Sequence, residues 1–91
     1  MILLERVGVW MTENETRLKK VYFVPEQSRF TLYAIAQSPT YDSELTQSLC
    51  VLLVELGEAG FDAFGSQIPD GTPEELSGFF NPSKALLLSR R

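Results

Sequence analysis

The sequence predicts a single α+β domain in which one long and one short helix pack on an antiparallel sheet. Three observations carry this prediction. The first third of the chain consists of aliphatic, aromatic and β-branched runs separated by polar clusters, the middle holds a leucine-rich segment with helical periodicity, and the end holds a capped helix start followed by an apolar run. With 91 residues, the chain has room for one hydrophobic core, so residues 1–91 are expected to form one domain.

The first third predicts a three-stranded meander. The expected strands are residues 2–11, 17–24 and 29–36, and polar turns at residues 12–16 and 25–28 separate them. Pro25 presets a turn dihedral and removes a ladder donor, which favours a chain reversal there.

The third run alternates in polarity, which is typical of a strand. Phe30, Leu32 and Ala34 point to one face, while Tyr33 and Ile35 point to the other. The outer face of the sheet is therefore expected to be more apolar than a solvated face requires.

Residues 43–58 are expected to form the long helix. Asp42 or Ser43 can cap its start, and Gly57 and Gly60 favour its end. A buried stripe follows the i, i+4, i+7, i+8, i+11 spacing, and further apolar residues widen it beyond one face: Leu45, Leu49, Leu52, Leu53, Leu56, Cys50, Val54 and Ala59. More than half of the helix surface is expected to need cover, from a second helix or from a partner subunit.

The last third predicts one more helix and one more strand. Residues 61–68 fit either a short strand or a loop. Thr72, Pro73 and Glu75 form the pattern of a capping box, so a short helix is expected over residues 73–80. Residues 84–89 are expected to form a buried strand, which gives the order β-β-β-α-(β)-α-β.

Charge and composition argue against binding to nucleic acid. The net charge is −4, whereas chains that bind nucleic-acid phosphates normally carry a basic excess. The charge is uneven, with +1 over residues 1–36 and −5 over residues 37–91. An acidic inhibitor or immunity-type protein that covers a basic partner is therefore one alternative.

Cysteine usage and hydropathy favour a cytoplasmic protein. A single cysteine excludes an intramolecular disulfide, and charges at Glu5 and Arg6 interrupt any secretion signal at the N-terminus. The longest apolar run has six residues, Leu49–Val54, which is far shorter than the roughly 20 residues of a membrane-spanning helix.

No residue pattern predicts catalysis, a cofactor or a metal. The chain has no histidine and one cysteine, and its six glycines match no nucleotide-binding pattern. Cys50 is expected to be a buried hydrophobe. Other polar clusters are expected to be structural, namely the carboxylates Asp62, Asp70, Glu74 and Glu75 and the basic group Arg17, Lys19 and Lys20.

The surplus of apolar side chains predicts a contact surface. We expect a non-enzymatic interaction module that forms a homodimer and binds another macromolecule. The expected contact residues are Trp10, Tyr22, Tyr33 and Ile35. The main alternative is a protein in which the same aromatic residues enclose an apolar cleft for a small ligand.

Overall fold

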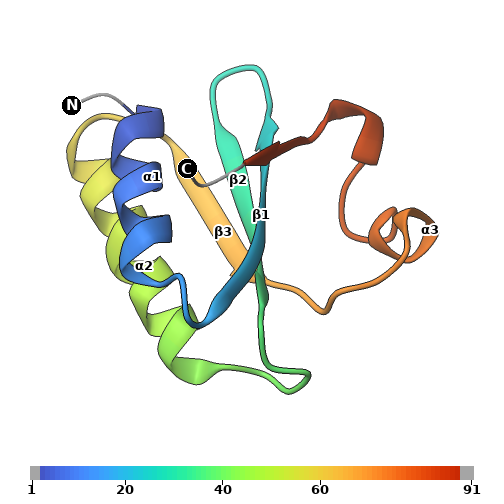
Figure 1. Cartoon of the computed structure of the whole chain (residues 1–91). Helices are drawn as coiled ribbons and strands as arrows, with labels where there is room; N and C mark the ends of the chain where they lie inside the picture. The colour runs from blue at the N-terminus through green and yellow to red at the C-terminus, as the bar shows by residue number, and fades with distance from the viewer. Residues whose placement is uncertain (1–2, 89–91) are drawn as a thin grey trace.

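The computed structural model describes residues 3–88 and contains a four-stranded mixed sheet with two helices on one face (Figure 1). Along the chain the elements are α1 (Leu3–Glu13), β1 (Leu18–Pro25), β2 (Phe30–Ala36), α2 (Ser43–Glu58), β3 (Ala63–Gln67), α3 (Pro73–Leu76), the 3₁₀ turn η1 (Pro82–Lys84) and β4 (Leu86–Leu88). The strand order is β3-β2-β1-β4. The α+β class is confirmed.

The sequence predicted an antiparallel sheet, but the observed sheet is mixed. β1 pairs antiparallel with both β2 and β4, but β2 and β3 run parallel. The parallel pair follows from α2, which carries the chain back along the sheet between β2 and β3. Residues 61–68, which fitted either strand or loop, therefore hold the edge strand β3.

The prediction of a strand over residues 2–11 is wrong. Residues 3–13 form helix α1, and residue 2 lies outside the described residues. Val7, Trp10 and Met11 are buried at the i, i+3, i+4 spacing of a helix. This periodicity prevails over the strand propensity of the valines and the tryptophan, so the expected meander is a two-stranded hairpin preceded by a helix.

Helix α2 spans the predicted range and is capped as expected. The carboxylate of Asp42 accepts a hydrogen bond from the backbone N–H of Leu45. Four of the five leucines in the predicted stripe are buried, at positions 45, 49, 52 and 56, and Leu53 is partly buried. Cys50 and Val54 are exposed, contrary to prediction, because α1 and the sheet cover only one side of the helix.

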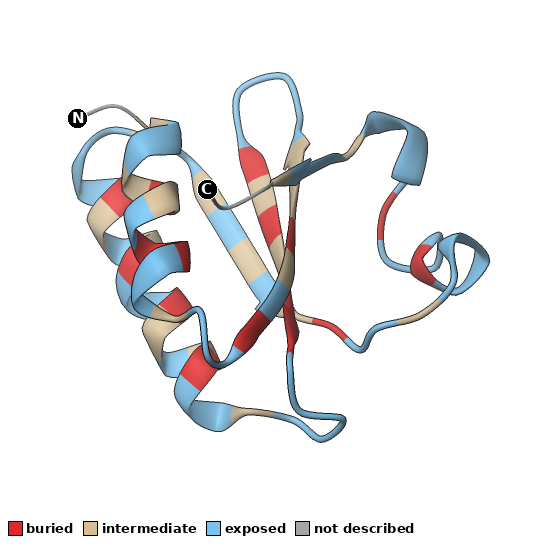
Figure 2. Ribbon diagram, in the orientation of Figure 1, coloured by how far each residue is buried: buried red, intermediate tan, exposed pale blue. Residues whose placement is uncertain are grey.

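Both faces of the sheet are covered (Figure 2). The larger core lies between the sheet and the two helices and includes Trp10, Val21, Leu32 and Leu49. The smaller cluster lies on the opposite face, where Ile68, Leu76 and Phe80 cover Ile35. The segment after β3 thus crosses to the outer sheet face, which the sequence analysis expected to be apolar and exposed.

The C-terminal elements are present but shorter than predicted. The capping box of Thr72 and Glu75 is confirmed, yet α3 ends at Leu76 because the chain turns tightly there, with the N–H groups of Phe79 and Phe80 both bonded to the Leu76 carbonyl. Lys84 belongs to η1 and not to a strand, and β4 covers residues 86–88. Residue 89 lies outside the described residues. Within residues 3–88, no helix is long and apolar enough to cross a membrane.

Candidate protein-binding surface

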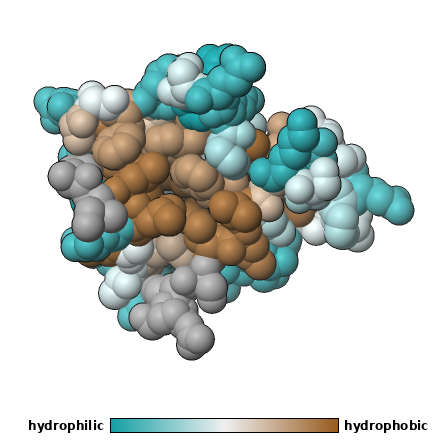
Figure 3. Space-filling view, turned by 90° about the horizontal axis from the view of Figure 1, so that it is seen from above, coloured by the Kyte–Doolittle hydropathy of each residue, from teal (hydrophilic) through white to brown (hydrophobic). Residues whose placement is uncertain are grey.

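One end of the molecule, the upper end in Figure 1, exposes a continuous apolar area. Figure 3 looks down on this end and shows hydrophobic side chains gathered at its centre, with hydrophilic ones around them. The start of α1, the end of β1, the start of β3 and β4 meet here. We define the upper apolar surface as Leu3, Phe23, Phe61, Leu86 and Leu88.

These side chains are the outer margin of the main core. Leu3, Phe23, Phe61 and Leu88 pack against the buried cluster but are only partly buried themselves. Leu86 is more than half exposed. The helix layer and the sheet therefore leave the core incompletely covered at this end.

A row of aromatic rings lines the surface. The ring centroids of Phe23 and Phe30 lie 5.1 Å apart, and those of Phe30 and Phe61 lie 6.4 Å apart in an edge-on arrangement. Phe30 is buried, so it supports the two outer rings from below. Such contacts favour a rigid apolar surface, because each ring is held on one side.

Strand β4 extends the surface on one face only. Leu86 pairs with Phe23 and lies on the helix side of the sheet, whereas Leu87 pairs with Tyr22 on the opposite side. Both leucines are 56% exposed. They are therefore a matched pair of residues, one inside the upper apolar surface and one outside it.

Charged side chains lie beside Phe23 and Phe61, because Glu26, Arg29 and Asp62 line one shallow depression with these two rings. In the turn between β1 and β2, Arg29 Nε donates to Glu26 Oε2 at 3.1 Å, and its guanidinium also lies over the Phe64 ring. No member of the upper apolar surface is titratable. An apolar centre with a polar rim is typical of protein–protein interfaces.

The four residues expected from the sequence to form the contact lie elsewhere. Trp10 is buried between α1 and α2, where its Nε1–H donates to Ser48 Oγ at 2.8 Å. Ile35 is buried beneath Phe80 and its neighbours. Their role in contacting a second molecule stays a prediction, and in this chain their surfaces are covered by its own side chains.

The two tyrosines lie with Ile35 on the far face. The rings of Tyr22 and Tyr33 each lie 5.0 Å from the ring of Phe80, and Tyr33 Oη donates to the Phe79 carbonyl at 3.3 Å. Both tyrosines are partly buried. The structure thus brings Tyr22, Tyr33 and Ile35 together and places Trp10 on the other side of the sheet.

Sequence reasoning missed the upper apolar surface. Residues 84–89 were predicted to form a buried strand, and Phe61 lies in the segment that fitted either a strand or a loop. The short apolar run could have indicated this surface. A short strand at the edge of a sheet has side chains on both faces and few neighbours to cover them.

The charged clusters of the sequence form ion pairs. Asp70 Oδ2 lies 2.5 Å from Lys19 Nζ, and Asp70 Oδ1 lies 3.8 Å from Lys20 Nζ. The hydrogen bond from Lys19 holds the pKa of Asp70 below its usual value. Arg17 pairs with Asp42 and Glu44.

Two of the remaining carboxylates lie at the start of α3. Glu75 completes the capping box, and Glu74 lies in the same first turn. Among residues 3–88, no group of three or more histidine, cysteine, aspartate or glutamate side chains is arranged to hold a metal ion.

No protein-family model matches the chain, and no curated protein matches it. A solved structure with a similar fold is a chain of the tri-AMPylated Shewanella oneidensis HEPN toxin in complex with MNT antitoxin. The two chains are 14% identical, with a TM-score of 0.57, over all of this chain and 74% of that one. At this identity the similarity shows the fold alone.

Proposed function

We propose that this chain is a small, non-enzymatic interaction module that presents its upper apolar surface to a second protein chain. The first partner is a second copy of the chain, in a twofold dimer, and the assembled module binds a further macromolecule.

The observation that carries the proposal is the uncovered margin of the core. Phe23, Phe61 and Leu88 belong to the core but remain partly open, and Leu86 extends the same area. Burial of apolar surface contributes about 25 cal/mol per Å², so covering this area would stabilise a complex. Contiguous apolar areas of this kind on a folded chain are typical of interaction sites.

The similar solved chain supports the same general class. It belongs to a complex between a toxin and an antitoxin, that is, to a protein assembled with another protein. A protein partner for this chain is consistent with that fold relationship.

A cytoplasmic location is part of the proposal. Cys50 is exposed and free, and it lies on the outer side of α2. An exposed thiol is kept reduced in the cytosol, whereas oxidising compartments favour its pairing with another thiol.

Sedimentation equilibrium with two matched variants tests self-association. Leu86→Lys places a charge inside the upper apolar surface, while Leu87→Lys places one at equal exposure on the opposite face. We expect the parent chain and the Leu87→Lys variant to dimerise, and the Leu86→Lys variant to be at least tenfold weaker, because an interface centre excludes unpaired charge. A parent chain that is monomeric up to tens of micromolar would refute the dimer.

A further inference from the structure

The outer side of α1 and α2, which faces away from the sheet, exposes apolar side chains. The two helices lie side by side on one face of the sheet (Figure 1), and their buried residues face it. Since a helix has about 3.6 residues per turn, Val9, Val51 and Val54 lie opposite these buried residues, and they are 48%, 60% and 62% exposed. We define the outer helix face as these three valines.

Two contacts between the helices bring the valines of α1 and α2 together. Arg6 donates to Glu55, and Trp10, further along α1, donates to Ser48, which comes earlier in α2. The helices are therefore antiparallel. On this alignment the valine of α1 lies level with the first valine of α2, so the outer helix face is continuous across both helices.

The net charge of the protein resides on these two helices. Together α1 and α2 contain five glutamates and one basic residue, Arg6, which gives a net charge of −4. Of the 8 basic and 12 acidic side chains of the whole chain, seven of each sign remain for the other residues, whose charges balance. The outer helix face therefore lies on the acidic part of the molecule.

The glutamates lie at both ends of the outer helix face. Because the helices are antiparallel, Glu5 and Glu58 lie at one end and Glu13 lies at the other. Glu5 and Glu58 are exposed and form no ion pair among residues 3–88.

Two of these glutamates are placed unfavourably for the helices themselves. Glu13 is the last residue of α1 and Glu58 the last of α2, and neither helix has a basic residue in its last turn. The partial negative charge at a helix C-terminus disfavours a carboxylate there. Cations of a partner at these positions would offset this cost.

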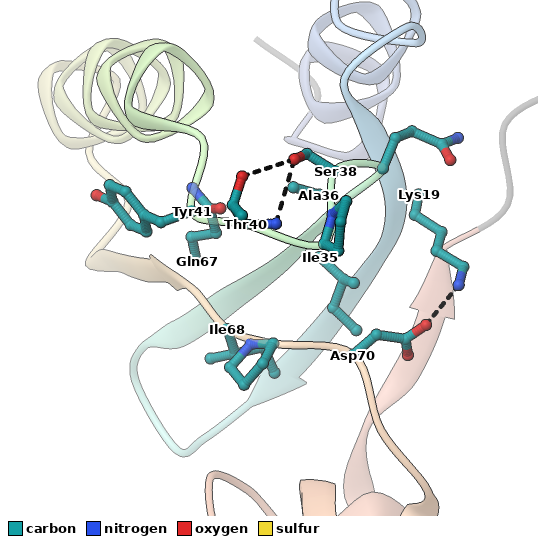
Figure 4. A pocket seen from close by; sticks show the side chains of 12 residues that line it. Lys19, Ile35, Ala36, Ser38, Thr40, Tyr41, Gln67, Ile68 and Asp70 are labelled. Atoms are coloured by element: carbon teal, nitrogen blue, oxygen red, sulfur yellow. Dashed lines mark hydrogen bonds and ion pairs between the residues drawn. The ribbon is translucent and has the colours of Figure 1, made fainter.

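Polar contacts hold the outer helix face in position. Gln67 of β3 lies beside the loop that leads into α2 (Figure 4), where its side chain bonds to both backbone groups of Asp42 and donates to Thr46 Oγ1. These bonds fasten the start of α2 to the sheet, and the two contacts with α1 fasten its later turns. A face held in this way loses little conformational entropy when it binds.

We propose that the outer helix face binds a basic amphipathic helix of a partner protein. The apolar side of that helix packs on the three valines, and its lysines or arginines lie at Glu5, Glu13 and Glu58. An apolar stripe between acidic ends fits such a helix, because it offers both a surface to bury and opposite charges. The outer helix face is separate from the upper apolar surface, so the inference goes beyond the interaction proposed there and does not depend on it.

Binding of a synthetic peptide of about 14 residues, followed by fluorescence anisotropy, tests the proposal. The peptide has leucines on one side and lysines on the other when helical. Its helix would be roughly 21 Å long, close to the roughly 24 Å of the 16-residue α2. We expect saturable binding of one peptide per chain, and about tenfold weaker binding when glutamates replace the lysines of the peptide.

Two charge-matched variants locate the bound peptide. Val51→Lys and Leu87→Lys each add one positive charge at similar exposure, the first on the outer helix face and the second on the far face of the sheet. Overall attraction of the peptide to the acidic chain falls equally in both variants. We expect Val51→Lys to weaken binding about tenfold and Leu87→Lys to weaken it by no more than about twofold.

Leu86→Lys separates this inference from the proposed function, because it changes the upper apolar surface. Its effect on peptide binding should equal that of Leu87→Lys. The inference is overturned if the lysine peptide does not bind saturably, if the glutamate peptide binds equally well, or if Val51→Lys and Leu87→Lys have equal effects. It is also overturned if Leu86→Lys weakens binding and Val51→Lys does not, a result that would leave the upper apolar surface as the contact.

Discussion

Arg6 on α1 and Glu55 on α2 form a two-pronged ion pair that joins the two helices. Arg6 Nε donates to Glu55 Oε2 and Nη2 donates to Oε1, each at 2.9 Å. The third nitrogen, Nη1, is buried, lies 4.0 Å from Glu13 Oε1 and has no hydrogen-bond partner among the described residues. The contact between the helices therefore includes a polar pair that fixes their alignment.

This pair makes part of the stability depend on pH. Hydrogen bonds from Arg6 hold the pKa of Glu55 below its usual value. A lowered folded-state pKa stabilises the fold above the unfolded-state value, about 4.3, and this contribution is lost as the pH falls through the lower folded-state value. We expect Arg6→Met to lower the melting temperature at pH 7, and the difference from the parent chain to shrink below about pH 4.

The control is Arg29→Met, which removes an exposed pair with Glu26. Its effect on the melting temperature should be small across the same pH range, since exposed pairs contribute little. Thermal melts from pH 7 to pH 3 measure both. A constant difference between the Arg6→Met variant and the parent chain down to pH 3 would contradict this account.

Gly65 is required by the close approach of β3 to β2 and α2. A Cβ at this position would lie 2.9 Å from the Leu32 carbonyl oxygen and 3.2 Å from Leu53 Cδ1. We expect Gly65→Ala to lower the free energy of unfolding by about 1–3 kcal/mol through overpacking.

Gly8→Ala is the matched substitution, because a Cβ on Gly8 in α1 meets nothing within 4 Å. It should raise the free energy of unfolding by roughly 0.5–1 kcal/mol, since alanine favours a helix. Urea unfolding measures both changes. Equal effects of the two substitutions would refute the packing role of Gly65.

Phe80 is the main cover of the far face of the sheet. It is buried against Ile35, stacks on the ring of Tyr33 and contacts the ring of Tyr22 in a tilted arrangement. We expect Phe80→Ala to cost about 3–5 kcal/mol of unfolding free energy. Phe79→Ala, at a neighbouring ring that is 47% exposed, should cost less than about 1 kcal/mol. If the two variants unfold at the same urea concentration, the far face is not held in this way.

The sequence predicted the elements whose signals are local. The α2 range, its cap at Asp42 or Ser43 and the capping box at Thr72 all depend on side chains within a few residues of the backbone groups they satisfy. The hairpin of β1 and β2 was likewise predicted from alternation and a proline turn. These signals do not require knowledge of distant contacts.

The wrong predictions concern segments whose structure depends on contacts with residues far away in the sequence. Residues 3–13 have strand-forming side chains, but α2 offers Ser48 and Glu55 to Trp10 and Arg6, and this pairing requires a helix. Gly65 weakened the strand signal of residues 61–68. In the structure, the same glycine permits the parallel pairing, because a Cβ there would lie too close to the Leu32 carbonyl oxygen. Ile35 faced outward in the sequence pattern and is covered by residues more than 30 positions away.

The measurement that tests the interaction account most directly is photo-crosslinking in the cells that produce the protein. Two full-length variants, Leu86→p-benzoylphenylalanine and Leu87→p-benzoylphenylalanine, place the same reactive group at equally exposed positions on opposite faces of β4. The account predicts a discrete protein adduct from position 86 and none from position 87, and the adduct mass then separates a second copy of the chain from another protein. The absence of an adduct from position 86, or identical adducts from both positions, would contradict it.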